Sequence, residues 1–136
     1  MVPNVDPRGV IHHDPRLIVL DKPSGLLAVP GRGPLLQDCL AGRVQATFPT
    51  AVVVHRLDRD TSGLMLMALD IDAQRYLSRQ FETRTVRKRY ECLVWGLPAA
   101  DDGLIDLPIA RDLVRPPRYG IDPVAGRPSQ IGRAHV

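Results

Sequence analysis

The stretch that decides the fold is the nine-residue segment His55-Arg56-Leu57-Asp58-Arg59-Asp60-Thr61-Ser62-Gly63. It lies between two short apolar runs, 51–54 and 64–69, and the first of these is rich in β-branched valine. Short apolar runs of this kind predict buried strands. We therefore expect the polar segment between them to be a loop on a rigid scaffold, which is where catalytic side chains are often found.

Seven of the nine positions spell His-Arg-Leu-Asp-x-x-Thr-Ser-Gly, which resembles the signature of the RluA family of RNA pseudouridine synthases. The aspartate of that signature is the family's catalytic residue, so the resemblance implies this role for Asp58. Composition alone would favour a loop carboxylate that caps nearby amides, and the specific match reverses that preference. Asp60 occupies a variable position of the motif, and we expect a structural role for it.

Three further segments resemble the same family, in the family's order. They are Asp21-Lys22-Pro23-Ser24-Gly25-Leu26-Leu27 with Val29-Pro30-Gly31-Arg32, a basic run that ends at Tyr90, and Gly103-Leu104-Ile105-Asp106-Leu107-Pro108-Ile109 with an arginine-rich loop after it. The resemblance covers roughly 17–129 and includes no S4-like segment, as in the small stand-alone members. Those members modify large-subunit 23S rRNA and, in some cases, a tRNA anticodon stem-loop, so the implied partner is structured RNA.

The reaction that the resemblance implies converts uridine to pseudouridine. It breaks the glycosidic bond, turns the base and rejoins it to the sugar through carbon. No redox step and no group donor is involved, so we expect no cofactor. A carboxylate can attack the anomeric carbon or accept the sugar 2′ proton, and both roles stay open for Asp58. The target uridine must also leave its stack, which costs least in a loop.

We expect substrate contacts from His55, Arg56 and Tyr90, and the resemblance implies the contact from Tyr90. The planar cation of Arg56 suits the space that a flipped base vacates, or a phosphate beside it, but in an extended segment it would point away from Asp58. Tyr90 is expected to stack on the uracil and to reach a proton with its hydroxyl; the alternative is a core tyrosine on a strand face. His55 is also compatible with a structural histidine, and we expect no proton transfer from it.

Basic side chains gather after the second expected helix and again closer to the C-terminus. The net charge of +3 and the pI of about 9.2 permit a polyanionic partner. We expect contacts to the RNA backbone from Arg84, Arg87, Lys88, Arg89, Arg115 and Arg118. The alternative for the denser run is an edge strand that its charges keep soluble.

The 136 residues are expected to form one domain. Apolar periodicity and turn residues predict helices at 35–48 and 71–83, the second capped by Asp70, and strands at 10–13, 17–22, 26–29, 51–54, 64–69, 84–96 and 103–109. The fold class is therefore α+β, with a mixed, mainly antiparallel sheet and flanking helices. The resemblance implies the pseudouridine synthase fold, incomplete at the C-terminus.

Other site classes find little support in the sequence. His12 and His13 have no further ligand at metal-binding spacing, so we expect no metal site. No apolar run approaches the roughly 18 residues that cross a membrane. The two cysteines show no pairing motif and fit a reducing compartment. We expect a cytoplasmic monomer without a membrane partner.

The family pattern breaks off after Gln130. In the family, a later Gly-Arg-x-His-Gln segment supplies a basic residue to the site, and residues 131–136 do not continue toward it. Back-translated, these six residues can be written ATC GGA AGA GCA CAC GTC, which resembles a sequencing adapter read in frame. We expect 1–130 to be the N-terminal part of a catalytic domain and 131–136 to be a non-native tail. The alternative function is an inactive truncated fragment that retains only RNA binding.

Overall fold

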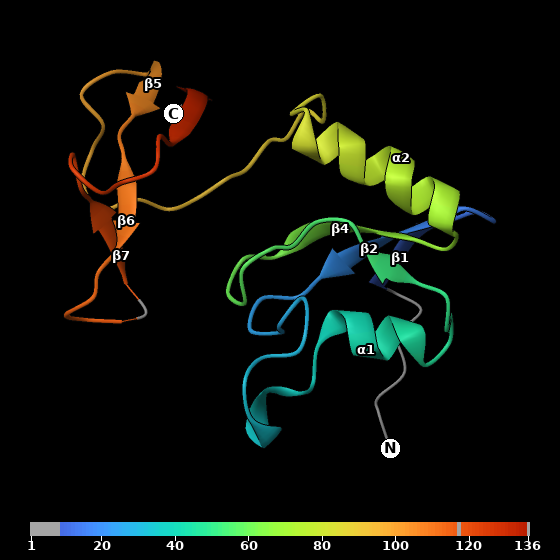
Figure 1. Cartoon of the computed structure of the whole chain (residues 1–136). Coiled ribbons are helices and arrows are strands. Elements are labelled where there is room, and N and C mark those ends of the chain that lie inside the picture. The colour runs from blue at the N-terminus through green and yellow to red at the C-terminus, as the bar shows by residue number, and fades with distance from the viewer. Residues whose placement is uncertain (1–8, 117, 136) are drawn as a thin grey trace. The chain divides into compact units, whose positions relative to one another are not determined.

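The computed structural model describes residues 9–116 and 118–135, with side chains described as far as Ile131. The chain divides into two compact units, Met1–Arg89 and Tyr90–Val136, which we describe one at a time (Figure 1). The segment 55–63, called the candidate loop below, lies in the first unit.

The first unit is built on a four-stranded antiparallel sheet in the order β1-β2-β4-β3. Its centre is the pair β2 (Leu17–Lys22) and β4 (Gly63–Ala68), which are in register from Leu17 opposite Ala68 to Lys22 opposite Gly63. The strands β1 (Val10–His13) and β3 (Val52–Val53) lie at the edges. The strands predicted at 10–13, 17–22 and 64–69 are confirmed, and the one predicted at 51–54 keeps only its two central residues.

The core of this unit lies between the sheet and α1 (Leu40–Gln45). Alternate residues of the two central strands point to the same face of the sheet. Ile18 and Leu20 of β2 and Met65 and Met67 of β4 have no exposed surface, and they form one cluster with the buried residues of α1. The sheet lies between α1 and α2 (Ile71–Glu82) in Figure 1.

The helix predicted at 71–83 is confirmed, and its ends show why it forms there. A side-chain oxygen of Asp70 accepts a hydrogen bond from the Ala73 amide at 2.8 Å, as expected for an N-cap. At the other end the Arg84 amide bonds the Phe81 carbonyl and the Thr85 amide bonds the Gln80 carbonyl. Arg84 has a φ of 56°, so this C-terminus is a Schellman-type cap with arginine in place of glycine.

Two predictions around α1 are wrong, and both errors arise from the way in which this helix begins. Residues 26–29 form no strand beyond an isolated bridge at Leu27, because the Leu27 and Ala28 carbonyls accept hydrogen bonds from the first amides of α1 at 2.8 and 3.1 Å. The helix predicted at 35–48 is reduced to a 3₁₀ turn, Pro34–Leu36, and to the short α1. Cys39 is extended and its sulfur accepts from the Gly42 amide, so the helix can begin only at residue 40.

The second unit consists of two antiparallel strand pairs. β5 (Asp102–Asp106) pairs with β8 (Gln130–His135), and β6 (Ile109–Arg111) pairs with β7 (Tyr119–Ile121). The single strand predicted at 103–109 is wrong, because it is divided at Pro108, which has no amide hydrogen to donate.

The strand predicted within 84–96 is also wrong. Alternating side chains favour a strand only where a neighbouring backbone completes the ladder, and in the described part of the chain no backbone bond joins 86–96 to another strand. Leu93 and Trp95 are fully exposed on this segment.

The class is α+β, as predicted, and every strand pair is antiparallel within the described residues. The structure pairs 130–135 with β5 and leaves Ile131 more than half exposed. That 131–136 is a non-native tail stays a prediction, and residue 136 lies outside the described residues. No helix in the described ranges is both long enough and apolar enough to cross a membrane.

Candidate active site

The candidate loop connects β3 to β4, and its backbone alternates between core and solvent. The Leu57 side chain is buried in the core of the first unit, while its neighbour Asp58 is exposed. The Asp58 carbonyl accepts a hydrogen bond from the Thr61 amide at 3.2 Å, which closes a turn directly after the aspartate. Leu57 therefore anchors the loop, and the carboxylate of Asp58 is left on the open side.

Asp58 lies in an open hollow of about 360 Å³, lined by the segments 27–29 and 56–59. Arg56 lines the same hollow, on a segment, 54–62, that is irregular rather than extended. The structure thus brings Arg56 and Asp58 to one hollow, and the expectation that their side chains point apart stays a prediction. Within the described residues the Asp58 carboxylate forms no hydrogen bond or salt bridge, so it is free to meet a ligand.

Sequence reasoning missed Lys22 as a site residue. Its side chain has no exposed surface, and its Nζ donates to the carbonyl oxygens of Pro23, Leu26 and Arg59 at 2.9, 2.7 and 2.9 Å. Burial lowers the pKa of Lys22, and the negative charges of Asp60 and Asp58 partly oppose that shift. The available signal was position: Lys22 ends a strand whose alternate residues, Ile18 and Leu20, are core residues.

Two further hydrogen bonds join the turn after Lys22 to the candidate loop. The Gly25 amide donates to the Arg59 carbonyl at 2.9 Å, and the Ser24 hydroxyl donates to the Asp60 carbonyl at 2.8 Å. Gly25 has a φ of 87°, a conformation that favours glycine. The segment Lys22–Gly25 therefore fixes the backbone on the C-terminal side of Asp58.

Asp60 is engaged differently from Asp58. Its carboxylate accepts from the Arg59 guanidinium at 2.9 Å, and this bond lowers the pKa of Asp60. Both side chains are largely exposed, so the pair adds little to stability. These contacts agree with the structural role predicted for Asp60.

His55 makes its contacts with the protein itself. Its Nε2 accepts a hydrogen bond from the Leu66 amide at 2.9 Å, and its ring stacks on Phe81 with centroids 4.4 Å apart. Burial lowers the pKa of His55, and the charge of Lys88 lowers it further. The ring therefore ties the loop to β4 and α2 in its neutral form, and a substrate contact from His55 stays a prediction.

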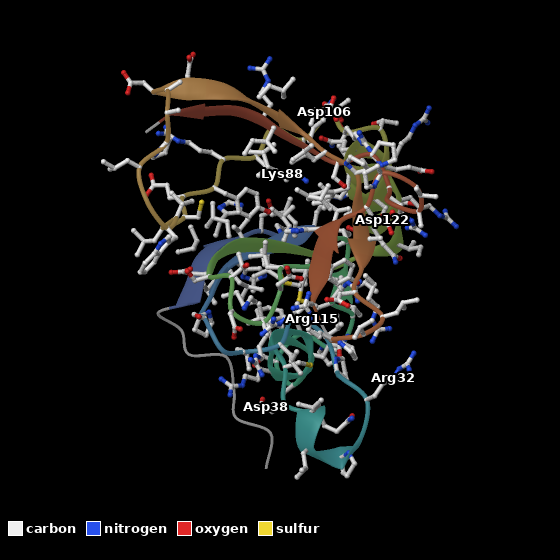
Figure 2. The ribbon with its side chains drawn as sticks, turned by 90° about the vertical axis from the view of Figure 1, so that its left-hand side faces the viewer. Arg32, Asp38, Lys88, Asp106, Arg115 and Asp122 are labelled. Carbon is white, nitrogen blue, oxygen red and sulfur yellow. The ribbon has the colours of Figure 1, made fainter. Side chains whose placement is uncertain are left out.

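The other predicted RNA and substrate contacts fall in both units. In the first unit Arg84, Arg87, Lys88 and Arg89 are exposed after α2. Arg32, for which no contact was predicted, extends from the 31–36 loop into solvent (Figure 2). In the second unit Tyr90 is 60% exposed and lies outside any strand, so it is not a core tyrosine. The β6–β7 turn carries Arg118 and Arg115, whose Nε donates to Asp112 at 3.0 Å.

The described side chains also bear on metal binding. Among residues 9–116 and 118–131, no three His, Cys, Asp or Glu side chains gather in a way that could hold a metal ion. His12 and Asp14 form a pair at 3.1 Å at the end of β1, and none of the described side chains supplies a third ligand to it.

Comparison with known proteins agrees with this geometry. A family model described as RNA pseudouridylate synthase matches residues 16–135. The "Dual-specificity RNA pseudouridine synthase RluA" of Yersinia pestis is 46% identical over 121 residues, which are 89% of this chain and 59% of that protein. The proteins of the same name from Salmonella typhi and Vibrio vulnificus are 41% and 42% identical and are covered to 55% and 52% of their lengths. The chain thus spans little more than half the length of these relatives.

Two solved structures share the fold. The human RNA pseudouridylate synthase domain containing 4 superposes with a TM-score of 0.58 at 24% identity, over 93% of this chain and 49% of that one. The human RNA pseudouridylate synthase domain containing 1 superposes with a TM-score of 0.62 at 20% identity, over 90% of this chain and 48% of that one. With the family model matching almost the whole sequence, the chain belongs to the RNA pseudouridylate synthase family.

Proposed function

We propose that this protein isomerises uridine to pseudouridine in structured RNA, with Asp58 as the catalytic carboxylate. The observation that carries the proposal is the environment of Asp58. Asp58 lines an open hollow, and its carboxylate has no hydrogen-bond or salt-bridge partner among the described residues. Its loop is fixed by a buried leucine on one side and by the segment 22–25 on the other. A held backbone with a free carboxylate is what a positioned nucleophile or base requires.

Two routes lead from this carboxylate to pseudouridine. In the first, a carboxylate oxygen attacks the anomeric carbon and breaks its bond to N1; the base turns, its C5 attacks the same carbon, the ester bond breaks and the C5 proton is lost. In the second, the carboxylate takes the 2′ proton as N1 leaves, and the proton returns when C5 rejoins the glycal. In both routes C5 loses its proton to water and N1 takes up a proton in its place, so substrate and product are isomers. Each route therefore balances without a further reactant, and the proposal includes no cofactor and no metal.

The neighbours of Asp58 suit the other tasks of such an enzyme. Arg56 lines the same hollow, and we assign its guanidinium to the gap that the flipped uridine leaves, or to a phosphate beside it. Tyr90 is exposed and is proposed to stack on the uracil. His55 is proposed to border the substrate while it keeps its bond to the Leu66 amide.

The RNA backbone is proposed to bind the exposed cations Arg84, Arg87, Lys88, Arg89, Arg115 and Arg118. The relatives' name, "dual-specificity RNA pseudouridine synthase", supports more than one RNA class as substrate. We propose ribosomal RNA, a tRNA anticodon stem-loop, or both. Such substrates would place the protein in the cytoplasm, where we propose that it acts as a monomer.

The test is the release of tritium from RNA labelled at uracil C5, measured in a single turnover. Asp58→Asn keeps the shape of the side chain and removes the carboxylate, so we expect turnover to disappear while folding and RNA binding remain. Asp60→Asn is the matched control and is expected to stay active, because Asp60 is paired with Arg59. Turnover by Asp58→Asn would overturn the assignment.

A second candidate function is RNA binding without catalysis. It is favoured by the coverage of the relatives, of which this chain spans 52–59% in the three cases given above. RNA binding by the wild-type chain with no tritium release would support this second function over the first.

A further inference from the structure

Lys22 is the one buried charged side chain among the residues that the structure describes. Its ammonium group has three protons, and three carbonyl oxygens lie within 2.9 Å of its Nζ. A neutral amine has only two hydrogens and would leave one of these carbonyls without its donor. The arrangement therefore needs the charged form, which is costly to bury without such partners.

The three acceptors come from two places in the chain. Pro23 and Leu26 belong to the turn after β2, while Arg59 directly follows Asp58 in the candidate loop. The Arg59 carbonyl also accepts from the Gly25 amide, and the next carbonyl, that of Asp60, accepts from the Ser24 hydroxyl. Two successive carbonyls after Asp58 are thus held by three donors from 22–25.

We propose that Lys22 is a positioning residue for Asp58: its buried ammonium fixes the Arg59 carbonyl and thereby the direction in which the Asp58 carboxylate enters the hollow. The inference rests on the proposed function for its catalytic consequence. It goes beyond that function because Lys22 does not line the hollow and has no exposed surface through which to meet RNA. Its effect on the reaction passes through the backbone of Arg59.

The charge of Lys22 has a second consequence for the site. The three atoms that bond it are neutral carbonyl oxygens, so its electrostatic partners are the carboxylates of Asp60 and Asp58. The buried cation therefore favours a conformation of the loop that keeps these carboxylates close. An apolar side chain of the same length would supply neither the hydrogen bonds nor this attraction.

The main variant is Lys22→Met, which keeps the length of the side chain and removes the charge and all three donors. We call the hydrogen bonds from Lys22, Ser24 and Gly25 to the Arg59 and Asp60 carbonyls the clamp. We expect the Gly25 and Thr61 amides to exchange with deuterium about tenfold faster, because both belong to the turns that the clamp holds. We expect the single-turnover rate constant to fall about tenfold or more, while the RNA dissociation constant changes by less than about twofold.

Met67→Ala is the matched control, since Met67 is equally buried in the same sheet and does not contact the clamp. It lowers stability by leaving a cavity. The two variants are compared at urea concentrations that give them the same free energy of unfolding. Under these conditions the ratio of the Gly25 exchange rate to the exchange rates of the β2 amides should be the wild-type ratio in Met67→Ala. If both variants lose rate and protection in the same proportion, Lys22 acts only through stability and the proposal is overturned.

Ser24→Ala tests the same clamp with an exposed side chain, so it remains informative if Lys22→Met does not fold. It removes the Ser24 hydroxyl, which is one of the three groups in 22–25 that donate to the Arg59 and Asp60 carbonyls. We expect a smaller change in the same direction, with the single-turnover rate constant falling about threefold. Wild-type exchange and wild-type rate in Ser24→Ala and in any folded Lys22 variant would overturn the proposal. Turnover by Asp58→Asn in the same assay would instead overturn the proposed function, while the exchange data would still decide whether the clamp exists.

Discussion

Asp58 and Leu57 are adjacent in sequence and differ completely in surroundings. Leu57 is 9% exposed and packs in the core of the first unit, whereas Asp58 is open to solvent in the hollow. A single peptide bond therefore connects the hydrophobic core to the residue whose carboxylate is proposed to react. Arg56, on the other side of Leu57, shares that hollow and is the residue whose geometry can be tested most directly.

Replacing Arg56 by lysine keeps the charge and removes the plane of the guanidinium. If the plane fills the gap left by a flipped uridine, the single-turnover rate constant should fall about tenfold, equivalent to about 1.4 kcal/mol of transition-state free energy. Arg43→Lys is a suitable control, because Arg43 of α1 is paired with Asp38, which precedes the helix, and does not line the hollow. Equal rates for the wild type and Arg56→Lys would instead indicate a simple phosphate contact.

Three secondary-structure elements hold the candidate loop: β2 and β4 through hydrogen bonds, and α2 through a stacked ring. The Leu66 amide of β4 donates to His55, whose ring is stacked on Phe81 of α2, so one imidazole connects loop, strand and helix. Protonation of Nε2 would put a hydrogen where the Leu66 amide now donates. The link is therefore sensitive to pH.

The pKa of His55 is lowered from 6.5 in the folded protein, first by burial and then by the Lys88 charge. Its contribution to stability is accordingly complete above pH 6.5 and is lost as the pH falls through the lower folded value. We expect the free energy of unfolding to decrease between pH 7.5 and pH 5, measured in urea by circular dichroism.

The variant that isolates this effect is His55→Leu. It should show a weaker pH dependence over the same range. It should also be less stable than the wild type at pH 7.5 by about 1–3 kcal/mol, because the partly buried Leu66 amide loses its acceptor. A His55→Leu protein with the full wild-type pH dependence would show that another group causes it.

At the C-terminus of α2, we expect one substitution to raise the stability of the protein and to weaken its binding to RNA. Arg84 adopts a φ of 56°, which costs an arginine about 1 kcal/mol relative to glycine. Arg84→Gly should therefore raise the free energy of unfolding by about 1 kcal/mol while RNA binding weakens through the lost charge. Arg87→Gly is the control and should weaken RNA binding without raising stability. Arg84 is the non-glycine residue with a positive φ in the described chain, so glycine relieves no backbone strain at position 87. An unchanged or lower stability of Arg84→Gly would contradict the account of the cap.

The elements that the sequence predicts correctly are those whose cause is local. β2 and β4 follow from apolar runs, and α2 follows from its periodicity together with Asp70 as the cap. Residues 26–29 resemble a strand equally well, but their carbonyls are taken by the first amides of α1, which local pattern does not reveal. The position of Asp58 follows from its motif. The role of Lys22 does not, because the carbonyl of Arg59, 37 positions away, is what makes its burial possible.

For the whole molecule, the proposed RNA surface is divided between the two units. The first contributes the exposed run after α2, and the second contributes Arg115 and Arg118 from the β6–β7 turn. Arg115 is partly neutralised by its bond to Asp112 at 3.0 Å, whereas the cations of the run form no salt bridge with the described residues. The run should therefore dominate the salt dependence of binding.

The double variant Arg87→Ala, Lys88→Ala should flatten the plot of log affinity against log salt concentration. Each phosphate contact contributes about 0.7–0.9 to that slope, so the loss should be about 1.5 if both cations bind phosphate. The control removes two cations outside the run, Arg16 and Arg43, which are paired with Asp70 and Asp38. Equal slopes for the two double variants would mean that the run is a solvated surface.

Trp95 has a consequence for how any of these variants is observed. It is the chain's single tryptophan, it is fully exposed, and it belongs to the second unit, whereas Asp58, Lys22 and His55 all belong to the first. Because its indole is already in water in the native state, we expect tryptophan fluorescence to change little when the sheet that carries Asp58 unfolds. A phenylalanine-to-tryptophan replacement at Phe81, beside the His55 ring, would give the first unit an optical reporter of its own, quenched when the imidazole is protonated.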